Sequence, residues 1–215
     1  MRTGIFGGSF DPIHRGHLTI AHEMMRSCEL DRILFIPAPA PPHKTRQKLT
    51  PFHHRLAMTR LAVADCPAFS VSDLEAQRQG KSYSIDTLRQ LHRHHPEDEF
   101  FLLIGMDSFL AFDSWKNYAD FFPLCHLVVA LRPGSSFEPQ SGRLPVALAP
   151  HFCYDSQLGA YRHASGNRLF FLEETFCPVS STEVRQRLKE HRSVADMIPA
   201  GVLDYIVRYH LYSNT

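Results

Sequence analysis

The stretch TGIFGGSFDPIHRGHL, Thr3 to Leu18, decides the fold because it joins a short apolar run to a loop rich in glycine and histidine. The run TGIF is typical of a buried strand, and the apolar spacing from Gly16 onward is that of an amphipathic helix. Gly7 and Gly8 let the backbone between this strand and this helix turn sharply and approach a ligand closely. The two histidines of this loop then either hold a ligand or are incidental members of a turn.

Strands and helices alternate along the rest of the chain. A strand, a helix and a second strand of this length form a parallel unit with a right-handed crossover. We therefore expect an α/β fold with a doubly wound, mostly parallel sheet, whose ligand site lies at the carboxyl ends of the strands. Apolar runs predict the further strands at residues 32–37, 69–73, 100–105, 125–134 and 168–174.

Capping residues indicate where the middle helices begin. Thr50 followed by Pro51 predicts an N-cap and a first helical position, opening a helix that runs through Ala64. Ser84 is expected to cap a helix over residues 85–94.

The C-terminal part is expected to be helical. Ser180 and Glu183 have the spacing of a capping box, and Pro199 is placed to start a last helix. Residues 180–215 are therefore predicted to complete a single domain, 1–215. The stretch around 134–167 is rich in Pro, Gly and Ser and is expected to be an irregular excursion.

The composition is that of an ordinary globular domain. The 215 residues are 44% hydrophobic and 21% charged, with a net charge of +1. This balance gives no support to a nucleic-acid or membrane-surface partner held by bulk electrostatics. Five scattered cysteines without C-x-x-C spacing indicate neither a zinc knuckle nor a disulfide framework. With no apolar signal segment and no run long enough to span a bilayer, a cytoplasmic location is expected.

Several kinds of ligand site could use the opening loop. A dinucleotide fingerprint does not fit the spacing of Gly4, Gly7 and Gly8, and the Gly-Lys-Ser/Thr of a P-loop is missing. His14 and His17 could bind a metal, but no third ligand follows from the spacing. The N–H groups and positive end of the helix that follows favour an anion, so phosphate is the ligand best matched to the loop.

These residues carry a family resemblance. GGSFDPIHRGH resembles the H-x-G-H signature of the nucleotidyltransferase superfamily, and VSSTEVR resembles its I-S-S-T-x-I-R signature, with Val179 where Ile is usual. The segments PPHK, YSIDTL, LIGMDSFLAFDSW, LRPG and YIVRYHLY are similar to those of the bacterial nicotinate mononucleotide adenylyltransferases. The resemblance covers nearly the whole chain and weakens between Gly134 and Asn167. It implies a Rossmann-like nucleotidyltransferase fold.

The resemblance also implies a reaction. ATP and nicotinate mononucleotide would give nicotinate adenine dinucleotide and pyrophosphate, by direct in-line attack without a covalent intermediate, in NAD biosynthesis. The attacking phosphate oxygen is already anionic, so alignment and charge stabilisation are needed rather than a base. Mg²⁺ is implied with ATP, held by few protein ligands. The expected partners are these two small molecules, with no nucleic acid or membrane, for a monomer or small homo-oligomer.

Site residues follow from matching the motifs residue by residue. His17 is expected at the α-phosphate with His14 beside it, and Lys44 and Arg185 complete the expected catalytic set. Trp115 would stack on the pyridine ring, with Thr87 near its carboxylate. The expected ATP-binding residues are Gly7, Gly8, Ser9, Phe10, His17, Asp107, Ser180, Ser181, Thr182 and Arg185, and those for nicotinate mononucleotide are Lys44, Arg46, Thr87, Trp115 and Arg132.

Some of these positions have alternatives. Arg46 fits a solvated basic loop, Asp107 fits a helix N-cap, and a lone Trp115 fits a core position. A sister transferase taking nicotinamide mononucleotide or phosphopantetheine would keep both signatures, as would a nucleotide sensor without turnover.

Overall fold

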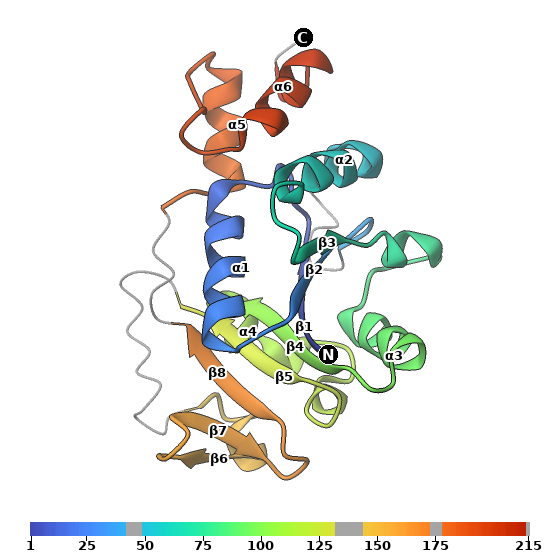
Figure 1. The fold of residues 1–215 in the computed structure, drawn as a ribbon, viewed down its shortest axis with the longest axis vertical. Coiled ribbons are helices and arrows are strands. Elements are labelled where there is room, and N and C mark those ends of the chain that lie inside the picture. Colours follow the sequence, from blue (N-terminus) through green and yellow to red (C-terminus); the bar gives the residue numbers. More distant parts are fainter. Residues whose placement is uncertain (42–48, 132–143, 173–177, 214–215) are drawn as a thin grey trace.

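The computed structural model describes residues 1–41, 49–131, 144–172 and 178–213, which form one eight-stranded sheet flanked by helices (Figure 1). The strands are β1 (Arg2–Gly8), β2 (Arg32–Pro37), β3 (Phe69–Val71), β4 (Glu99–Gly105), β5 (His126–Ala130), β6 (Phe152–Asp155), β7 (Ala160–His163) and β8 (Arg168–Leu172). The helices are α1 (Arg15–Ser27), α2 (Phe52–Val63), α3 (Ser84–His94), α4 (Met106–Leu110), α5 (Ser181–Lys189) and α6 (Ala200–Arg208).

The sheet is doubly wound, as the sequence predicts. Its order is β3-β2-β1-β4-β5-β8-β7-β6, and every pair from β3 to β8 is parallel. Ile5 of β1 is paired with Leu34 of β2 on one side and with Leu102 of β4 on the other. The chain leaves β1 toward β2 and later returns to β4, so the strand order reverses between β1 and β4. In such sheets the reversal point is where ligands bind.

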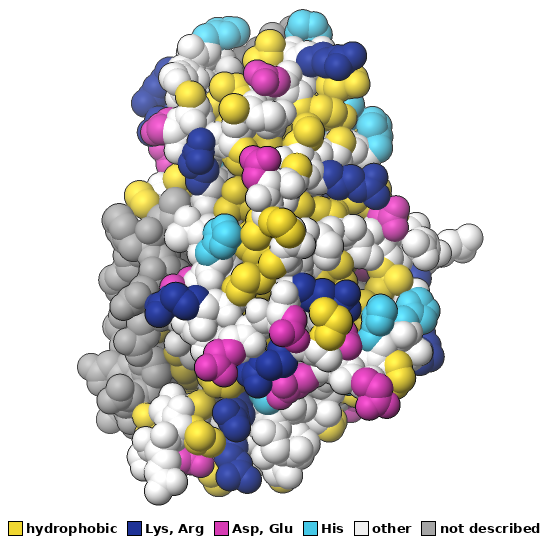
Figure 2. Space-filling model, in the orientation of Figure 1, with side chains coloured by type: hydrophobic (Ala, Val, Ile, Leu, Met, Phe, Trp, Pro, Cys, Tyr) yellow, Lys and Arg dark blue, Asp and Glu magenta, His cyan; other side chains and the backbone are white. Residues whose placement is uncertain are grey.

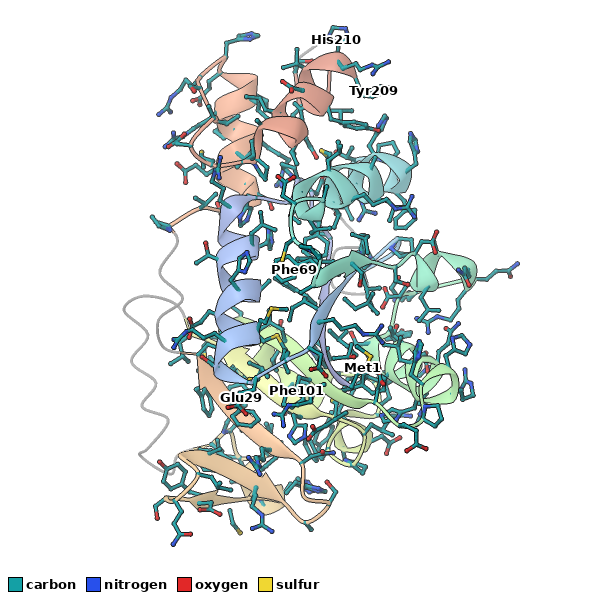
Figure 3. All side chains as sticks on the ribbon, in the orientation of Figure 1. Met1, Glu29, Phe69, Phe101, Tyr209 and His210 are labelled. Carbon is teal, nitrogen blue, oxygen red and sulfur yellow. The ribbon has the colours of Figure 1, made fainter. Side chains whose placement is uncertain are left out.

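Two cores cover the two faces of the sheet. Phe6, Phe35 and Phe101 pack with α1 and α2, whereas Ile5 and Leu102 pack with α3. Figure 1 shows α1 and α3 on opposite sides of the sheet, and Figure 3 shows Phe101 on the α1 side. Burial on both faces explains why the parallel strands are almost continuously apolar in sequence.

The C-terminal helices extend the core that α1 and α2 make. Val184 of α5 and Ile206 of α6 are buried in the same cluster as Met24 of α1 and Met58 of α2. The helical C-terminal segment is therefore confirmed. Ser180 caps α5 as expected, because its side chain accepts a hydrogen bond from the Glu183 N–H at 3.1 Å.

Residues 152–163 correct the expectation of an irregular excursion. They form β6 and β7, an antiparallel pair that continues the sheet beyond β8. The strands have four residues each, and their buried side chains are few, among them Phe152 and Tyr161. So short a pattern is hidden in sequence by the Pro, Gly and Ser around it.

Two helix starts also differ from expectation. The N-cap of α2 is Pro51 rather than Thr50, whose N–H donates instead to the Asp11 carboxylate at 3.2 Å. The N-cap of α3 is Tyr83, so Ser84 is the first helical residue. Each shift is one position, which places the Ser84 N–H in the first turn of α3.

The surface carries mixed charge. Figure 2 shows Lys and Arg interspersed with Asp and Glu over the described part of the face that it displays. None of the helices in the described ranges combines the length and apolar content that a membrane span requires.

Candidate active site

Two adjoining cavities lie where β1 and β4 end, at the reversal point of the sheet. The larger cavity, of about 720 Å³, is bordered by the starts of α1 and α5. The smaller cavity, of about 290 Å³, is bordered by the start of α3. The residues that line both are Gly7, Leu103, Ser108 and Trp115. Ligands in the two cavities would therefore meet at this shared wall.

The larger cavity faces two helix N-termini. His14 is the N-cap of α1 and Ser180 is the N-cap of α5, and both line the cavity. N–H groups in the first turn of a helix have no partner within that helix, and they lie at its positive end. Two such ends beside one cavity suit a ligand with several negative charges, such as a polyphosphate.

The orientation of the His17 ring is fixed by the backbone before it. Its Nδ1 accepts a hydrogen bond from the His14 N–H at 3.2 Å. In the neutral ring the proton is therefore on Nε2, which is the donor. The ring also packs edge-on against Phe10, with centroids 5.1 Å apart. His17 lines the larger cavity, so the loop presents a preoriented donor to that site.

His14 is a buried histidine held neutral. Its side chain is 6% exposed, and burial lowers its pKa to about 4. Its Nδ1 has no hydrogen-bond partner among the described residues, although the ring stacks 3.6 Å from that of His17. A buried polar atom without a partner costs free energy, which a bound ligand would recover. Together with its place on the wall of the larger cavity, this makes His14 a candidate ligand-binding residue.

The two glycines of the loop have different roles. A Cβ on Gly7 would meet no atom within 4 Å, so this position leaves open space beside both cavities. A Cβ on Gly8 would lie 2.9 Å from the Phe10 ring, which is 1% exposed. Gly8 and Ser9 line the smaller cavity, and Phe10 lines neither, supporting His17 from behind.

The second motif is joined directly to the first loop. The Ser181 hydroxyl donates to the Pro12 carbonyl at 2.9 Å, and Arg185 Nη1 donates to the Asp11 carbonyl at 2.7 Å. Arg185 Nη2 also donates to the Thr182 hydroxyl at 3.3 Å. Among the expected residues of this motif, the structure places Ser180 and Ser181 on the wall of the larger cavity but neither Thr182 nor Arg185.

Aromatic and helix-terminal groups line the smaller cavity. The Trp115 ring packs against Phe112 and Phe121, with centroids 5.1 and 5.7 Å apart, and borders both cavities. Ser84, at the start of α3, and Lys116 also line it. A flat ring beside a helix N-terminus suits an aromatic ligand that bears an acceptor group.

Thr87 lies away from the wall of the smaller cavity. Its side chain is buried, and its hydroxyl donates to Glu75 Oε1 at 2.6 Å and accepts from Arg78 Nη2 at 2.6 Å. Glu75 does line the cavity, and burial raises the pKa of its carboxyl. Thr87 therefore contacts a residue of the cavity wall and does not itself line the cavity.

Other expected residues fall outside the site or outside the described chain. Asp107 is exposed in the first turn of α4 and lines neither cavity, whereas the next residue, Ser108, lines both. Lys44, Arg46 and Arg132 lie outside the described residues.

Sequence reasoning missed the wall residues Glu75, Ser108 and Lys116. Ser108 and Lys116 directly follow the singled-out Asp107 and Trp115, which is the signal that could have found them.

Comparisons with known proteins show the family to which the chain belongs. A family model described as cytidylyltransferase-like matches residues 5–187. A protein of Syntrophotalea carbinolica named as a probable nicotinate-nucleotide adenylyltransferase is 49% identical over 100% of this chain and 98% of its own length. One of Geobacter sulfurreducens with the same name is 45% identical over 100% and 99%.

Solved structures show the same fold. The chain is similar to Plasmodium falciparum nicotinic acid mononucleotide adenylyltransferase complexed with NaAD, with a TM-score of 0.71. The two are 21% identical over 98% of this chain and 97% of that one. The same enzyme complexed with APC gives a TM-score of 0.69.

Proposed function

Because the chain belongs to the nicotinate-nucleotide adenylyltransferase family, we propose that it transfers the adenylyl group of ATP to nicotinate mononucleotide in NAD biosynthesis. The products are nicotinate adenine dinucleotide and pyrophosphate. The observation that carries this proposal is the pair of adjoining cavities, one facing two helix N-termini and the other bordered by Trp115. ATP occupies the larger cavity and the acceptor the smaller one.

The reacting atoms then meet at the shared wall. The 5′-phosphate of the acceptor attacks the α-phosphorus of ATP in line, and pyrophosphate leaves toward α5. The nucleophile is already an anion, so the side chains hold and orient rather than remove a proton. His17 donates from Nε2 to the oxygens where charge accumulates, and neutral His14 lies beside it. Arg185, anchored on the Asp11 carbonyl, holds the end of α5 at which the pyrophosphate leaves.

Magnesium fits this site as an ion carried by the nucleotide. Among the described residues, no group of three or more His, Cys, Asp or Glu side chains is placed to hold a metal. Phosphate oxygens would supply most of the ligands, as is usual for Mg²⁺, and the bound ion would neutralise part of the phosphate charge. Lys44, Arg46 and Arg132 are proposed, from the family resemblance, to assist at the phosphates and the acceptor.

The acceptor is recognised at the start of α3. Trp115 stacks on the pyridine ring, and the first-turn N–H groups of Ser84 and Ile85 meet its carboxylate. A carboxylate only accepts hydrogen bonds, whereas an amide would place its own NH₂ donors against these N–H donors. Two such bonds at about 1.5–3 kcal/mol each predict a preference for the acid of at least about a hundredfold in kcat/KM.

Steady-state assays test this proposal. Pyrophosphate release is measured with ATP, Mg²⁺ and one of three acceptors: nicotinate mononucleotide, nicotinamide mononucleotide or phosphopantetheine. Turnover that favours the acid mononucleotide by about a hundredfold or more is expected. Equal efficiency with the amide would refute the carboxylate pocket. Nucleotide binding without turnover on any acceptor would indicate a sensor.

The setting of the enzyme is also proposed. The described cysteines Cys28, Cys66, Cys125 and Cys153 are free thiols, which suits a reducing cytoplasm. Strands β6 to β8 continue the sheet, which supports one domain over the chain. We expect a monomer or a small homo-oligomer acting on small molecules.

A further inference from the structure

The carboxylate of Asp11 is buried within the phosphate-binding loop. Its side chain is 3% exposed. One oxygen accepts from the Tyr212 hydroxyl at 2.6 Å, and the other accepts from the Thr50 N–H at 3.2 Å. Three segments far apart in the sequence therefore meet at one carboxylate, and none of the three residues lines either cavity.

The backbone at Asp11 links the two helix starts that face the larger cavity. The carbonyls of Asp11 and Pro12 accept from Arg185 and Ser181 of α5, and His14, the N-cap of α1, comes two residues later. A movement of this backbone would change the spacing between the N-termini of α1 and α5. That spacing decides whether N–H groups on both sides reach the same polyphosphate.

Tyr212 reaches Asp11 from beyond the end of α6. Its backbone adopts φ = +64°, a conformation that non-glycine residues adopt rarely. Burial and the neighbouring Asp11 charge raise the pKa of the Tyr212 hydroxyl, which therefore stays protonated and donates. The neighbouring guanidinium of Arg55, 1% exposed, donates to the carbonyls of Ser9 and Thr50 and so fixes the surrounding loops.

We propose that Tyr212 is a positioning residue for the phosphates of ATP, acting through Asp11 on the spacing of the two helix N-termini. The proposal rests on the function proposed above. Without the Tyr212 hydroxyl, one oxygen of a buried carboxylate has no donor among the described residues, and the loop must shift to let water reach it. The carbonyls that hold Ser181 and Arg185 shift with it.

The variant Tyr212→Phe removes this donor and keeps the ring. Its matched control is Tyr209→Phe, three residues earlier, because Tyr209 is 46% exposed and stacks on Tyr205. Figure 3 shows Tyr209 at the outer end of α6. In the full-length protein, Kd for a non-hydrolysable ATP analogue is measured by calorimetry, and KM and kcat are measured for both substrates.

Tyr212→Phe is expected to raise the Kd of the analogue and the KM of ATP about tenfold. The KM for nicotinate mononucleotide stays within about twofold, and Tyr209→Phe behaves as the wild type. A merely structural role would not separate the two substrates. Equal behaviour of the two variants overturns the inference, whereas a wild-type protein that neither binds the analogue nor turns over refutes the proposed function instead.

Hydrogen exchange of the wild-type protein gives a second measurement, should Tyr212→Phe fail to fold. Coupling between two sites is reciprocal, so if Tyr212 favours ATP binding, ATP must stabilise the contact of Tyr212. The analogue is expected to slow amide exchange in residues 209–213, which line neither cavity. Unchanged exchange in that segment overturns the inference without any variant.

Discussion

His14 is expected to make the stability of the protein depend on pH between about 6.5 and 4. Burial lowers its pKa to about 4 in the folded protein, whereas an unfolded histidine titrates near 6.5. Within that window the unfolded chain binds a proton that folded His14 does not. The free energy of unfolding therefore falls as the pH is lowered, by about 3 kcal/mol once the window has been crossed.

Comparison with a variant isolates this contribution. Burial also lowers the pKa of His54, His126 and His163, so the wild type loses stability at acid pH for several reasons. His14→Gln removes one titrating group and keeps a polar side chain. Urea unfolding at pH 7.5 and 5.0 should show the wild type losing about 2 kcal/mol more than His14→Gln. His22→Gln, an exposed position on the same helix, is the matched control.

A bound nucleotide should reduce the loss of stability at acid pH. Phosphates bound beside His14 would favour its charged form and raise its pKa, which narrows the pH range over which folded and unfolded His14 differ in protonation. Repeating the titration with a saturating ATP analogue is therefore expected to reduce the loss in the wild type. Equal losses in the wild type and His14→Gln would show that His14 is not the buried neutral group that its environment indicates.

Four further predictions concern the same loop and its partner helix. His17→Ala should fold and lose about a hundredfold in turnover, measured by pyrophosphate release; near-normal turnover would remove its role. Gly8→Ala, crowding Phe10, should lower the free energy of unfolding by about 1–3 kcal/mol. Gly7→Ala should have a free energy of unfolding within about 0.5 kcal/mol of the wild type, yet bind substrate more weakly. If urea unfolding showed Gly7→Ala to be less stable than Gly8→Ala, both assignments would be contradicted. Arg185→Lys keeps the charge but loses the planar fork that donates to both the Asp11 carbonyl and the Thr182 hydroxyl, so the Kd of an ATP analogue should rise about tenfold by calorimetry.

The central parallel part of the fold was predictable because β1, β4 and β5 are buried on both faces. Ile5 and Phe6 face different cores, so the run containing them is apolar without interruption. The place of this loop beside a cavity was also predictable, because glycines and histidines at a strand-to-helix junction have few structural uses. The pair β6 and β7 was not predictable, since strands of four residues bury too few side chains to leave a pattern.

Site residues were less predictable when their partners came from distant elements. Thr87 lies on α3, the helix that borders the smaller cavity. Its hydroxyl, however, donates to Glu75, which lies outside that helix. Likewise, no local pattern relates Asp11 to Tyr212, which are 201 positions apart. Sequence spacing gives the face of a helix on which a residue lies, and it does not give the group that faces it across the fold.

The charges around the larger cavity bear on how catalysis is achieved. Apart from its two histidines, the one ionisable side chain among its described lining residues is Glu183, which pairs with Arg187 at 2.7 Å. To the nucleotide proposed to bind there, this wall would therefore offer helix N-termini, hydroxyls and imidazoles rather than net positive charge. Such donors stabilise only the atoms toward which they are directed. Their hydrogen bonds strengthen most with the oxygens on which negative charge accumulates as the α-phosphorus is attacked. Removing one of them should consequently reduce kcat more than it raises the KM for ATP, because the interaction lost is stronger in the transition state than in the ground state.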